Sequence, residues 1–299
     1  MIIFYFAVPD FAAEPLTGEF DLLDCFGRMN LRFLKSALVE IGIYGIIQVK
    51  KQIERTVFMK ILVVNDDSIH SPGIALLAKA AMELGEVTVV APAHQCSAMS
   101  QKLTIQANLA VEKMEDFPVP VKAAYKVDGT PVDCVKVALH YILEEKPDYV
   151  FSGINDGYNV GFDIAYSGTL GACFEAVMNG VPAIAFSNTI FAPLHIAEEF
   201  LVPIAKELIE AGQGRGEVWN VNFPAVERGE LKGILWDRAI APMQFYSEYY
   251  AETRGPDGSI TLKGQGTPLT AADEVPAGTD IEAVLQGYIS VGKVKSAVL

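Results

Sequence analysis

Short apolar runs alternate with stretches of helical periodicity over most of this chain, which constrains its fold more than any other feature. Residues 60–65 form a β-branched, apolar run of strand length. Residues 72–84 carry apolar side chains at helical spacing, with Pro72 at the start and Gly85 just past the end, where helices favour these residues. The same pattern predicts strands at 87–90, 149–151, 181–186 and 218–223, strand-like alternation at 102–112, and helices at 131–143, 167–179 and 193–211.

Near-continuous apolar strands separated by helices are typical of a parallel sheet that is buried on both faces. We therefore expect an α/β fold, with a Rossmann-like, mostly parallel sheet and helices on both faces. From about residue 240 the chain becomes rich in Gly, Pro, Thr and Tyr, and the sequence GPDGS at 255–259 predicts a turn between two extended segments. This tail is expected to form a C-terminal hairpin arm, which packs either on a partner subunit or on its own core.

Residues 1–58 differ from the rest of the chain. Their acidic and basic residues nearly cancel, and they contain one candidate amphipathic helix, at 31–55, but no strand–turn–helix unit. The first predicted strand follows Met59 directly. We therefore expect 1–58 to be an appendage, consistent with an over-extended start before Met59, and 59–299 to form the core domain with its C-terminal arm.

The composition restricts the partners of this protein. Of its 299 residues 51% are hydrophobic, which is enough to bury a large core in one or two domains. Lys and Arg number 23 against 37 Asp and Glu, for a formal net charge of −14. Because such a chain repels phosphate backbones and anionic lipids, neither a nucleic-acid polymer nor a membrane is an expected partner.

The cysteines and the first residues indicate a cytoplasmic protein. Cys25, Cys96, Cys134 and Cys173 lie far apart, without a CxxC pair, which favours free thiols in a reducing compartment. Residues 1–11 are apolar but lack the basic region and the small-residue cleavage site of a secretory signal.

Polar residues follow three of the predicted strands, and ligands in open α/β sheets bind at the carboxyl ends of strands. Asp66 and Asp67 follow the first strand, Ser97 follows the second, and Asn155 follows the strand at 149–151. Two adjacent carboxylates raise each other's proton affinity unless a cation lies between them. With neutral oxygens from Ser97 and Asn155 the set favours a hard ion, Mg²⁺ or Mn²⁺. The alternative for the acidic pair is a solvated turn or a helix N-cap.

A second group of candidates concerns an anion. Ser167, Gly168 and Thr169 open a predicted helix, where backbone N–H groups bind phosphate, although an ordinary N-cap would use the same residues. Asn159, between Gly157 and Gly161, either contacts the same ligand or stabilises its own turn.

Taken together, these segments resemble the SurE (survival protein E) family of metal-dependent nucleotidases. The resemblance spans about 59–291, so it implies that 59–299 is a SurE-like metallophosphatase domain. Ser68 stands where a Gly often follows the acidic pair, Ala98 stands where a Gly follows the serine, and 93–96 lacks the usual basic residue; 1–58 has no counterpart. The matching segments are ILVVNDDSIHSPG (61–73), VVAP (89–92), GTPVDCV (129–135), SGIN (152–155, continuing to Gly161), YSGT (166–169), GTD (278–280) and GYIS (287–290).

The resemblance implies a 5′-nucleotidase that hydrolyses nucleoside 5′- and 3′-monophosphates. It also implies one divalent metal ion per subunit, and a homodimer or homotetramer formed through the C-terminal arm. Carried over by position, the metal ligands are Asp66, Asp67, Ser97 and Asn155, and the phosphate-binding residues are Asn159, Ser167, Gly168 and Thr169.

The expected mechanism is attack of a metal-activated water on the phosphomonoester, with Asp66 and Asp67 as catalytic residues. Which of the two aspartates orients or deprotonates the water stays open. The alternatives are a catalytically weakened metal- or nucleotide-binding protein, because of the changed loop at 93–96, and a phosphatase that prefers polyphosphate. A receiver-like signalling domain is disfavoured, because no Lys follows the strand at 181–186.

Overall fold

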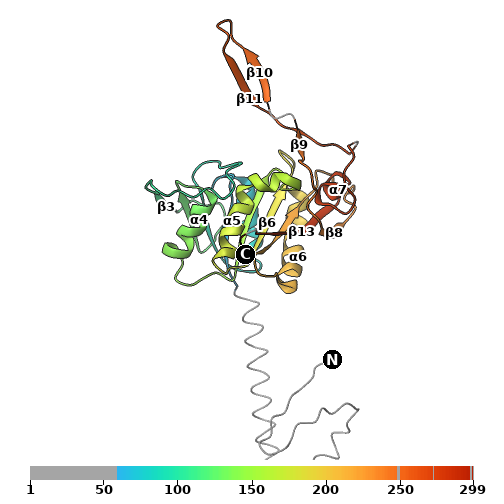
Figure 1. Ribbon diagram of the computed structural model, residues 1–299. Helices are drawn as coiled ribbons and strands as arrows, with labels where there is room; N and C mark the ends of the chain where they lie inside the picture. Colours follow the sequence, from blue (N-terminus) through green and yellow to red (C-terminus); the bar gives the residue numbers. More distant parts are fainter. Residues whose placement is uncertain (1–58, 248–249, 272, 297, 299) are drawn as a thin grey trace, which may run out of the picture. The chain divides into compact units, whose positions relative to one another are not determined.

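The structure, a computed structural model, describes residues 59–247, 250–271, 273–296 and 298. The segment 1–58, interpreted above as an appendage, lies outside these residues. The centre of the fold is a nine-stranded sheet (Figure 1). In chain order its strands are β1 (Met59–Val64), β2 (Gly85–Pro92), β3 (Val111–Met114), β4 (Ala123–Val127), β5 (Tyr149–Asp156), β6 (Ala183–Asn188), β7 (Glu217–Asn222), β8 (Ile234–Arg238) and β13 (Ile289–Lys295).

The order of strands across the sheet is β3-β4-β2-β1-β5-β6-β7-β13-β8. The six strands from β4 to β7 in this order run parallel, whereas β13 pairs antiparallel with β7, and β3 pairs antiparallel with β4. The predicted mostly parallel sheet is therefore confirmed. The chain builds outward from β1 in one direction through β2 and in the other through β5, and a crevice for ligands forms at such a switch point.

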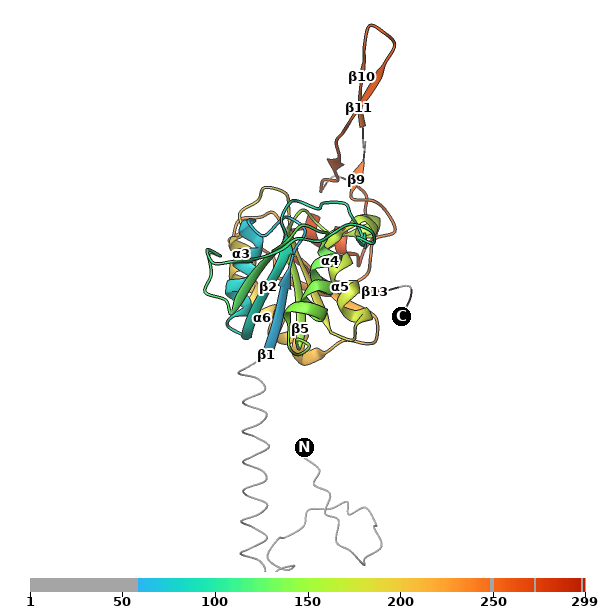
Figure 2. The ribbon, with the colours of Figure 1, turned by 90° about the vertical axis from the view of Figure 1, so that its left-hand side faces the viewer.

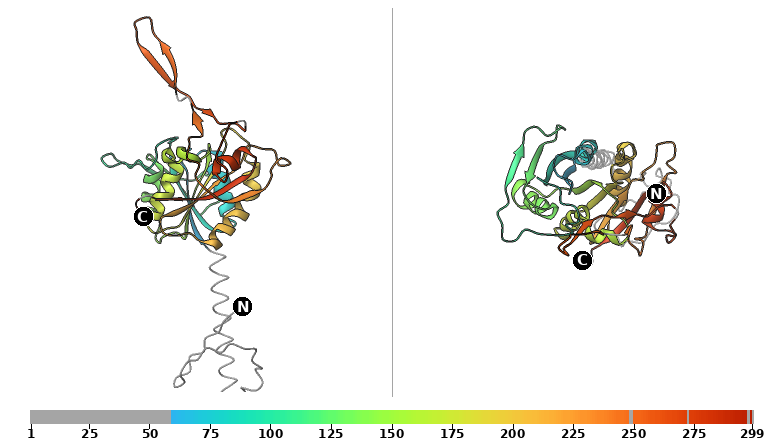
Figure 3. Two further views of the ribbon diagram at one scale, coloured as in Figure 1. Left: turned by 45° about the vertical axis from the view of Figure 1, so that its right-hand side comes forward. Right: turned by 90° about the horizontal axis from the view of Figure 1, so that it is seen from above.

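Helices cover both faces of the sheet, as expected (Figure 2, Figure 3). One face carries α3 (Pro72–Ala81) and α6 (His195–Ala211), and the other carries α4 (Pro131–Val137) and α5 (Gly168–Met178). Short helical segments complete the list: a π-helical turn (Ala138–Ile142), a 3₁₀ helix (Gly161–Tyr166) and α7 (Asp280–Leu285).

Strand β1 shows why the sequences of these strands are continuous apolar runs. Its successive side chains point to opposite faces, so Ile61 and Val63 pack with α3 and α6, whereas Leu62 and Val64 pack with α4 and α5. All four side chains are buried. Among the described residues, no helix is long and apolar enough to cross a bilayer.

The helix starts follow from capping chemistry. Ser71 precedes Pro72 and its hydroxyl accepts a hydrogen bond from the N–H of Ile74, at 3.3 Å. Thr130 and Asp133 form a capping box at the start of α4, in which each side chain accepts from the other's backbone N–H. Both helices therefore begin at the prolines that the sequence indicated.

The expected strand at 102–112 is wrong for most of its length, since the only strand there is β3, and β4 was not predicted. The hydrogen bonds of Asp133 explain why 102–110 is not a strand, because this carboxylate binds Thr104 within that loop. The N–H and the hydroxyl of Thr104 donate to its carboxylate at 3.0 and 2.7 Å, and the hydroxyl of Thr130 donates to the carbonyl of Lys102. These contacts replace the hydrogen bonds that a strand would make.

The predicted hairpin is present, as β10 (Tyr250–Arg254) and β11 (Ile260–Gly264), which pair antiparallel on either side of the GPDGS turn. The short strands β9 (Tyr246–Ser247) and β12 (Thr267–Pro268) pair before and after it. The extended tail is shorter than expected, however. After α7, β13 returns to the main sheet between β7 and β8, so residues 289–295 belong to the core.

Candidate active site

Asp66 lies two residues after the end of β1 and is buried, 3% exposed, at the carboxyl edge of the sheet. The hydroxyl of Thr169 donates a hydrogen bond to its Oδ1 at 2.8 Å. Gly168 lies against the same carboxyl group: a Cβ at this position would come within 2.9 Å of Oδ2. The first residues of α5 therefore pack closely against the Asp66 carboxyl group. Only glycine fits at position 168, where the helix contacts it.

The surroundings of Asp66 disfavour its charge when no cation is bound. Burial and the neighbouring charge of Asp67 raise the pKa of Asp66 from 3.8 to about 7, against the opposing effect of the Thr169 hydrogen bonds. A divalent cation between the two carboxylates would reverse this cost. The electrostatics of the pair therefore fit a divalent ion.

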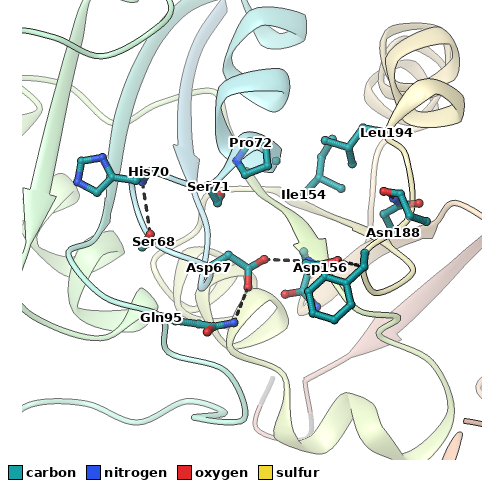
Figure 4. Close-up of a pocket in the computed structure, with 14 residues that line it drawn as sticks. Asp67, Ser68, His70, Ser71, Pro72, Gln95, Ile154, Asp156, Asn188 and Leu194 are labelled. Atoms are coloured by element: carbon teal, nitrogen blue, oxygen red, sulfur yellow. Dashed lines mark hydrogen bonds between the residues drawn. The ribbon is translucent and has the colours of Figure 1, made fainter.

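Asp67 is half-buried and lines a pocket of about 540 Å³ (Figure 4). Its Oδ2 accepts a hydrogen bond from the backbone N–H of Asp156 at 2.8 Å, and its Oδ1 accepts from the side chain of Gln95 at 3.4 Å. Burial raises the pKa of Asp67 despite these two bonds. Asp67 is thus the member of the pair that faces the pocket.

Asn155 lines the same pocket, near the end of β5. Its side-chain amide donates to the carbonyl of Gly157 at 2.7 Å. The bond fixes the orientation of the amide, so the side-chain oxygen points away from that carbonyl and is available to accept or to ligate.

Ser97 is exposed, in a loop that is attached to the site at two points. On one side of it, the N–H of Cys96 donates to the backbone carbonyl of Asp66 at 2.7 Å. On the other side, the N–H of Ser100 donates to the carbonyl of Tyr166, just before α5, at 2.9 Å. The structure therefore brings the segment that carries Ser97 beside Asp66, although Ser97 does not line the pocket around Asp67.

The residues expected to bind phosphate have structural contacts of their own. The hydroxyl of Ser167 accepts from the N–H of Leu170 at 3.1 Å and so caps α5. The Thr169 hydroxyl holds Asp66, as described above. Asn159 is buried, and its side chain donates to the hydroxyl of Ser187 at 2.7 Å. The assignment of these residues to phosphate stays a prediction.

The sequence interpretation missed Asp156, Gln95 and Phe191, which all line the pocket with Asp67. For each of these three residues, its position in the sequence could have indicated that it belongs to the site. Asp156 follows the candidate Asn155 directly, Gln95 lies two residues before Ser97, and Phe191 lies in the loop after β6. That loop begins at the same sheet edge as the other candidates.

Two residues that depart from the family pattern adopt backbone conformations that favour glycine. Ser68 has φ +84° and Ala98 has φ +57°. An L-residue in the left-handed region costs roughly 1–2 kcal/mol, which glycine avoids. Glycine would avoid this cost at both positions.

The described residues contain no group of three or more His, Cys, Asp or Glu side chains that could hold a metal ion. The candidate site instead combines two carboxylates with neutral oxygens, a donor set that suits a hard divalent ion better than zinc. The donor chemistry therefore agrees with the electrostatics of the acidic pair.

Comparison with known proteins gives consistent matches. The family model described as Survival protein SurE matches residues 61–244. The 5′-nucleotidase SurE of Geobacter sulfurreducens is 43% identical over 247 residues, which is 78% of this chain and 86% of the relative. The 5′-nucleotidase SurE of Thermosipho melanesiensis is 37% identical over 238 residues, covering 78% and 90%. The crystal structure of the SurE protein from Aquifex aeolicus is 36% identical, with a TM-score of 0.68, and the match covers 79% of this chain and 93% of that one.

Proposed function

This chain belongs to the survival protein SurE family, and on that premise we propose that it is a divalent-metal-dependent phosphomonoesterase acting on nucleoside 5′- and 3′-monophosphates. The proposal depends on one observation above all. The buried Asp66 lies next to Asp67, which lines the pocket at the carboxyl edge of the sheet. Two carboxylates in this position are stabilised by a doubly charged ion, and such an ion can activate water for phosphate-ester hydrolysis.

We assign the ion, Mg²⁺ or Mn²⁺ and one per subunit, to Asp66, Asp67, Ser97 and Asn155. The hydrogen bonds of Cys96 and Ser100 support the assignment of Ser97, since they hold its loop beside Asp66 and α5. When bound, such an ion would polarise the phosphoryl oxygens and lower the pKa of a water molecule.

Of the two aspartates, Asp67 is the better candidate to orient or deprotonate the attacking water. It lines the pocket, whereas Asp66 is buried and bonded to Thr169. The positive end of the helix dipole at the start of α5, an 11-residue helix, would stabilise negative charge on the phosphoryl oxygens. Asn159, Ser167, Gly168 and Thr169 are proposed as the residues on the phosphate side.

Phosphate release from AMP and 3′-AMP, with Mg²⁺ or Mn²⁺ and with EDTA, tests this function. We expect turnover with metal, loss with EDTA and recovery after metal is restored. Asp66→Asn and Asp67→Asn should each lower kcat by at least about 100-fold, near the scale of losing one strong electrostatic interaction. Circular dichroism shows whether the variants fold.

The outcome also separates the two alternatives. Metal binding without turnover of any nucleotide would indicate a binding protein that has lost its activity. Faster turnover of short polyphosphates than of AMP would indicate a polyphosphate-preferring phosphatase. Normal turnover of AMP by both aspartate variants would exclude the proposed site.

We propose that the protein forms a homodimer or homotetramer through its C-terminal arm. In the hairpin, Tyr250, Ile260 and Leu262 are 68%, 52% and 54% exposed, an apolar surface that a partner subunit would cover. Removing 250–264 should reduce the mass measured by light scattering to that of a monomer. An unchanged mass would exclude the arm as the contact.

We propose that the protein is cytoplasmic. Cys96, Cys134 and Cys173 are free and buried, which agrees with a reducing, cytoplasmic environment. We propose that 1–58 is dispensable, so a chain that starts at Met59 should keep its nucleotidase activity. Loss of folding on that deletion would refute this.

A further inference from the structure

We propose that the loop between β6 and α6 (residues 189–194) forms a nucleobase-binding platform, on which Phe191 stacks against the base of the substrate. This inference rests on the proposed nucleotidase function and extends it. It assigns the part of the site that would distinguish a nucleotide from a phosphate ester without a base.

The pocket beside Asp67 is lined by both polar and apolar groups. Asp67, Gln95 and Asn155 are polar, as are Asp156 and Asn188 beside the loop at 189–194, whereas Phe191, Ala192, Leu194 and Ile154 provide apolar surface. Gln95 and Leu194 lie on opposite sides of Asp67 (Figure 4). The volume of about 540 Å³ lies within the roughly 300–1,000 Å³ typical of small-molecule sites. A ligand that combines an anionic group with a flat apolar group, such as a nucleoside monophosphate, matches this mixed lining.

Phe191 is placed in an unusual way for an aromatic residue. Its side chain is 92% exposed, so it contributes little to the core, although it lines the pocket. Its backbone has φ +57°, a conformation that bulky L-residues rarely adopt. Such backbone outliers concentrate at functional sites, where neighbouring contacts hold them in place.

Asp156 supplies the contact that holds Phe191. Its Oδ1 accepts a hydrogen bond from the N–H of Phe191 at 2.7 Å, while its own N–H donates to Asp67 at 2.8 Å. One residue at the end of β5 therefore positions both Asp67 and the aromatic loop. The side chain of Asn188 also donates to the carbonyl of Ala192, at 3.2 Å. These bonds hold the loop beside Asp67 without a ligand, and a preformed binding surface reduces the entropy cost of binding.

The chemistry of the loop defines the class of ligand. Phe191, Ala192 and Leu194 offer ring and aliphatic surface, which contacts the face of a base and not its hydrogen-bonding edge. Stacking on an aromatic side chain is tolerant of sequence, because every base has a π-face. We therefore expect the platform to accept purine and pyrimidine nucleotides, and to favour both over ribose 5-phosphate.

The test compares ligands with and without a base. For wild type and Phe191→Ala, we would measure kcat/KM for AMP and for ribose 5-phosphate, with Mn²⁺ present. The ratio of the two values should fall about tenfold in Phe191→Ala, at the lower end of what base stacking contributes, and Phe191→Trp should restore it. Phe162→Ala is the matched control, since Phe162 is also exposed, at 54%, but does not line the pocket.

Calorimetric binding of adenosine, with ribose as the comparison, gives a second measurement that needs no turnover. Tighter binding of adenosine than of ribose, weakened about tenfold by Phe191→Ala alone, supports the platform whether or not AMP is hydrolysed. An unchanged ratio together with unchanged adenosine binding overturns it, even in an active nucleotidase. Failure of the proposed function is a separate result, namely no phosphate release from AMP by the wild type.

Discussion

The hydroxyl of Thr169 donates a hydrogen bond to Oδ1 of Asp66 at 2.8 Å, and this bond joins two buried residues 103 positions apart. It connects the first turn of α5 to the end of β1. In a metal site such a bond orients the carboxylate toward the ion, so Thr169 acts through Asp66.

Thr169→Val removes this bond while keeping the shape of the side chain. We expect metal affinity to fall about 10- to 100-fold, as is usual when a partner of a metal ligand is lost. Titration with Mn²⁺, followed by calorimetry, measures the change, and Thr169→Ser should recover most of the affinity. Equal affinity in wild type and Thr169→Val would show that the bond does not position the carboxylate.

Gly168→Ala places a methyl group against Asp66. The new Cβ would lie 2.9 Å from Oδ2 and 3.0 Å from the Cβ of Asp66, so the carboxyl group or the helix must move. A displacement on the scale of 1 Å commonly costs about 100-fold in rate, and we expect a loss of this order for AMP. Gly229→Ala is the control, because its Cβ would meet no atom within 4 Å. If both variants turn over AMP at the wild-type rate, the close fit at Gly168 is unimportant.

Ala98→Gly should stabilise the protein, unlike most alanine-to-glycine changes. At φ +57° the strain of roughly 1–2 kcal/mol is relieved, and the added entropy of the unfolded chain offsets about 0.5–1 kcal/mol of the gain. The expected net effect is about 0.5–1 kcal/mol of added stability, measured by urea unfolding. Ala225→Gly, at an exposed position without a positive φ, should instead be destabilising by a similar amount. Changes of the same sign in both variants would contradict the argument from strain.

Asp133 gives a prediction about pH. Burial raises the pKa of Asp133, but hydrogen bonds from Thr130 and Thr104 outweigh it, so the net pKa lies below the usual value of 3.8. A carboxyl group with a lowered pKa in the folded state adds stability above its unfolded pKa, and this contribution is lost as the pH falls through the folded pKa. The contribution should therefore be complete at pH 6 and decline below about pH 4.

Thr104→Val tests this contribution, because it removes a hydroxyl that donates to Asp133. We expect a loss of about 1–2 kcal/mol in the free energy of unfolding at pH 6, and a smaller difference from wild type at pH 3. Thr104→Ser should behave like wild type at both values. A difference that does not depend on pH would mean that the hydroxyl stabilises the loop without the charge of Asp133.

Local patterns predicted the elements that tertiary contacts do not override. The apolar run at the first strand and the Pro72 and Pro131 helix starts needed only near neighbours, and the structure has them within a few residues. The stretch 102–110 was misassigned because its alternation is overridden by Thr104, which binds Asp133 29 positions away. The return of β13 to the sheet was missed for a related reason, since its partner β7 is distant in the sequence.

The sequence by itself determined the α/β class and the position of Asp66 and Asp67 at a sheet edge, because strand and helix periodicities are local and parallel strands end on the same side. Only the tertiary structure decided which groups contact that pair. Thr169 lies 103 residues from Asp66, and Asp156 lies 89 residues from Asp67. Contacts at such separations depend on the order of strands and on how each loop closes. Neither of these produces a periodic pattern in the amino-acid sequence.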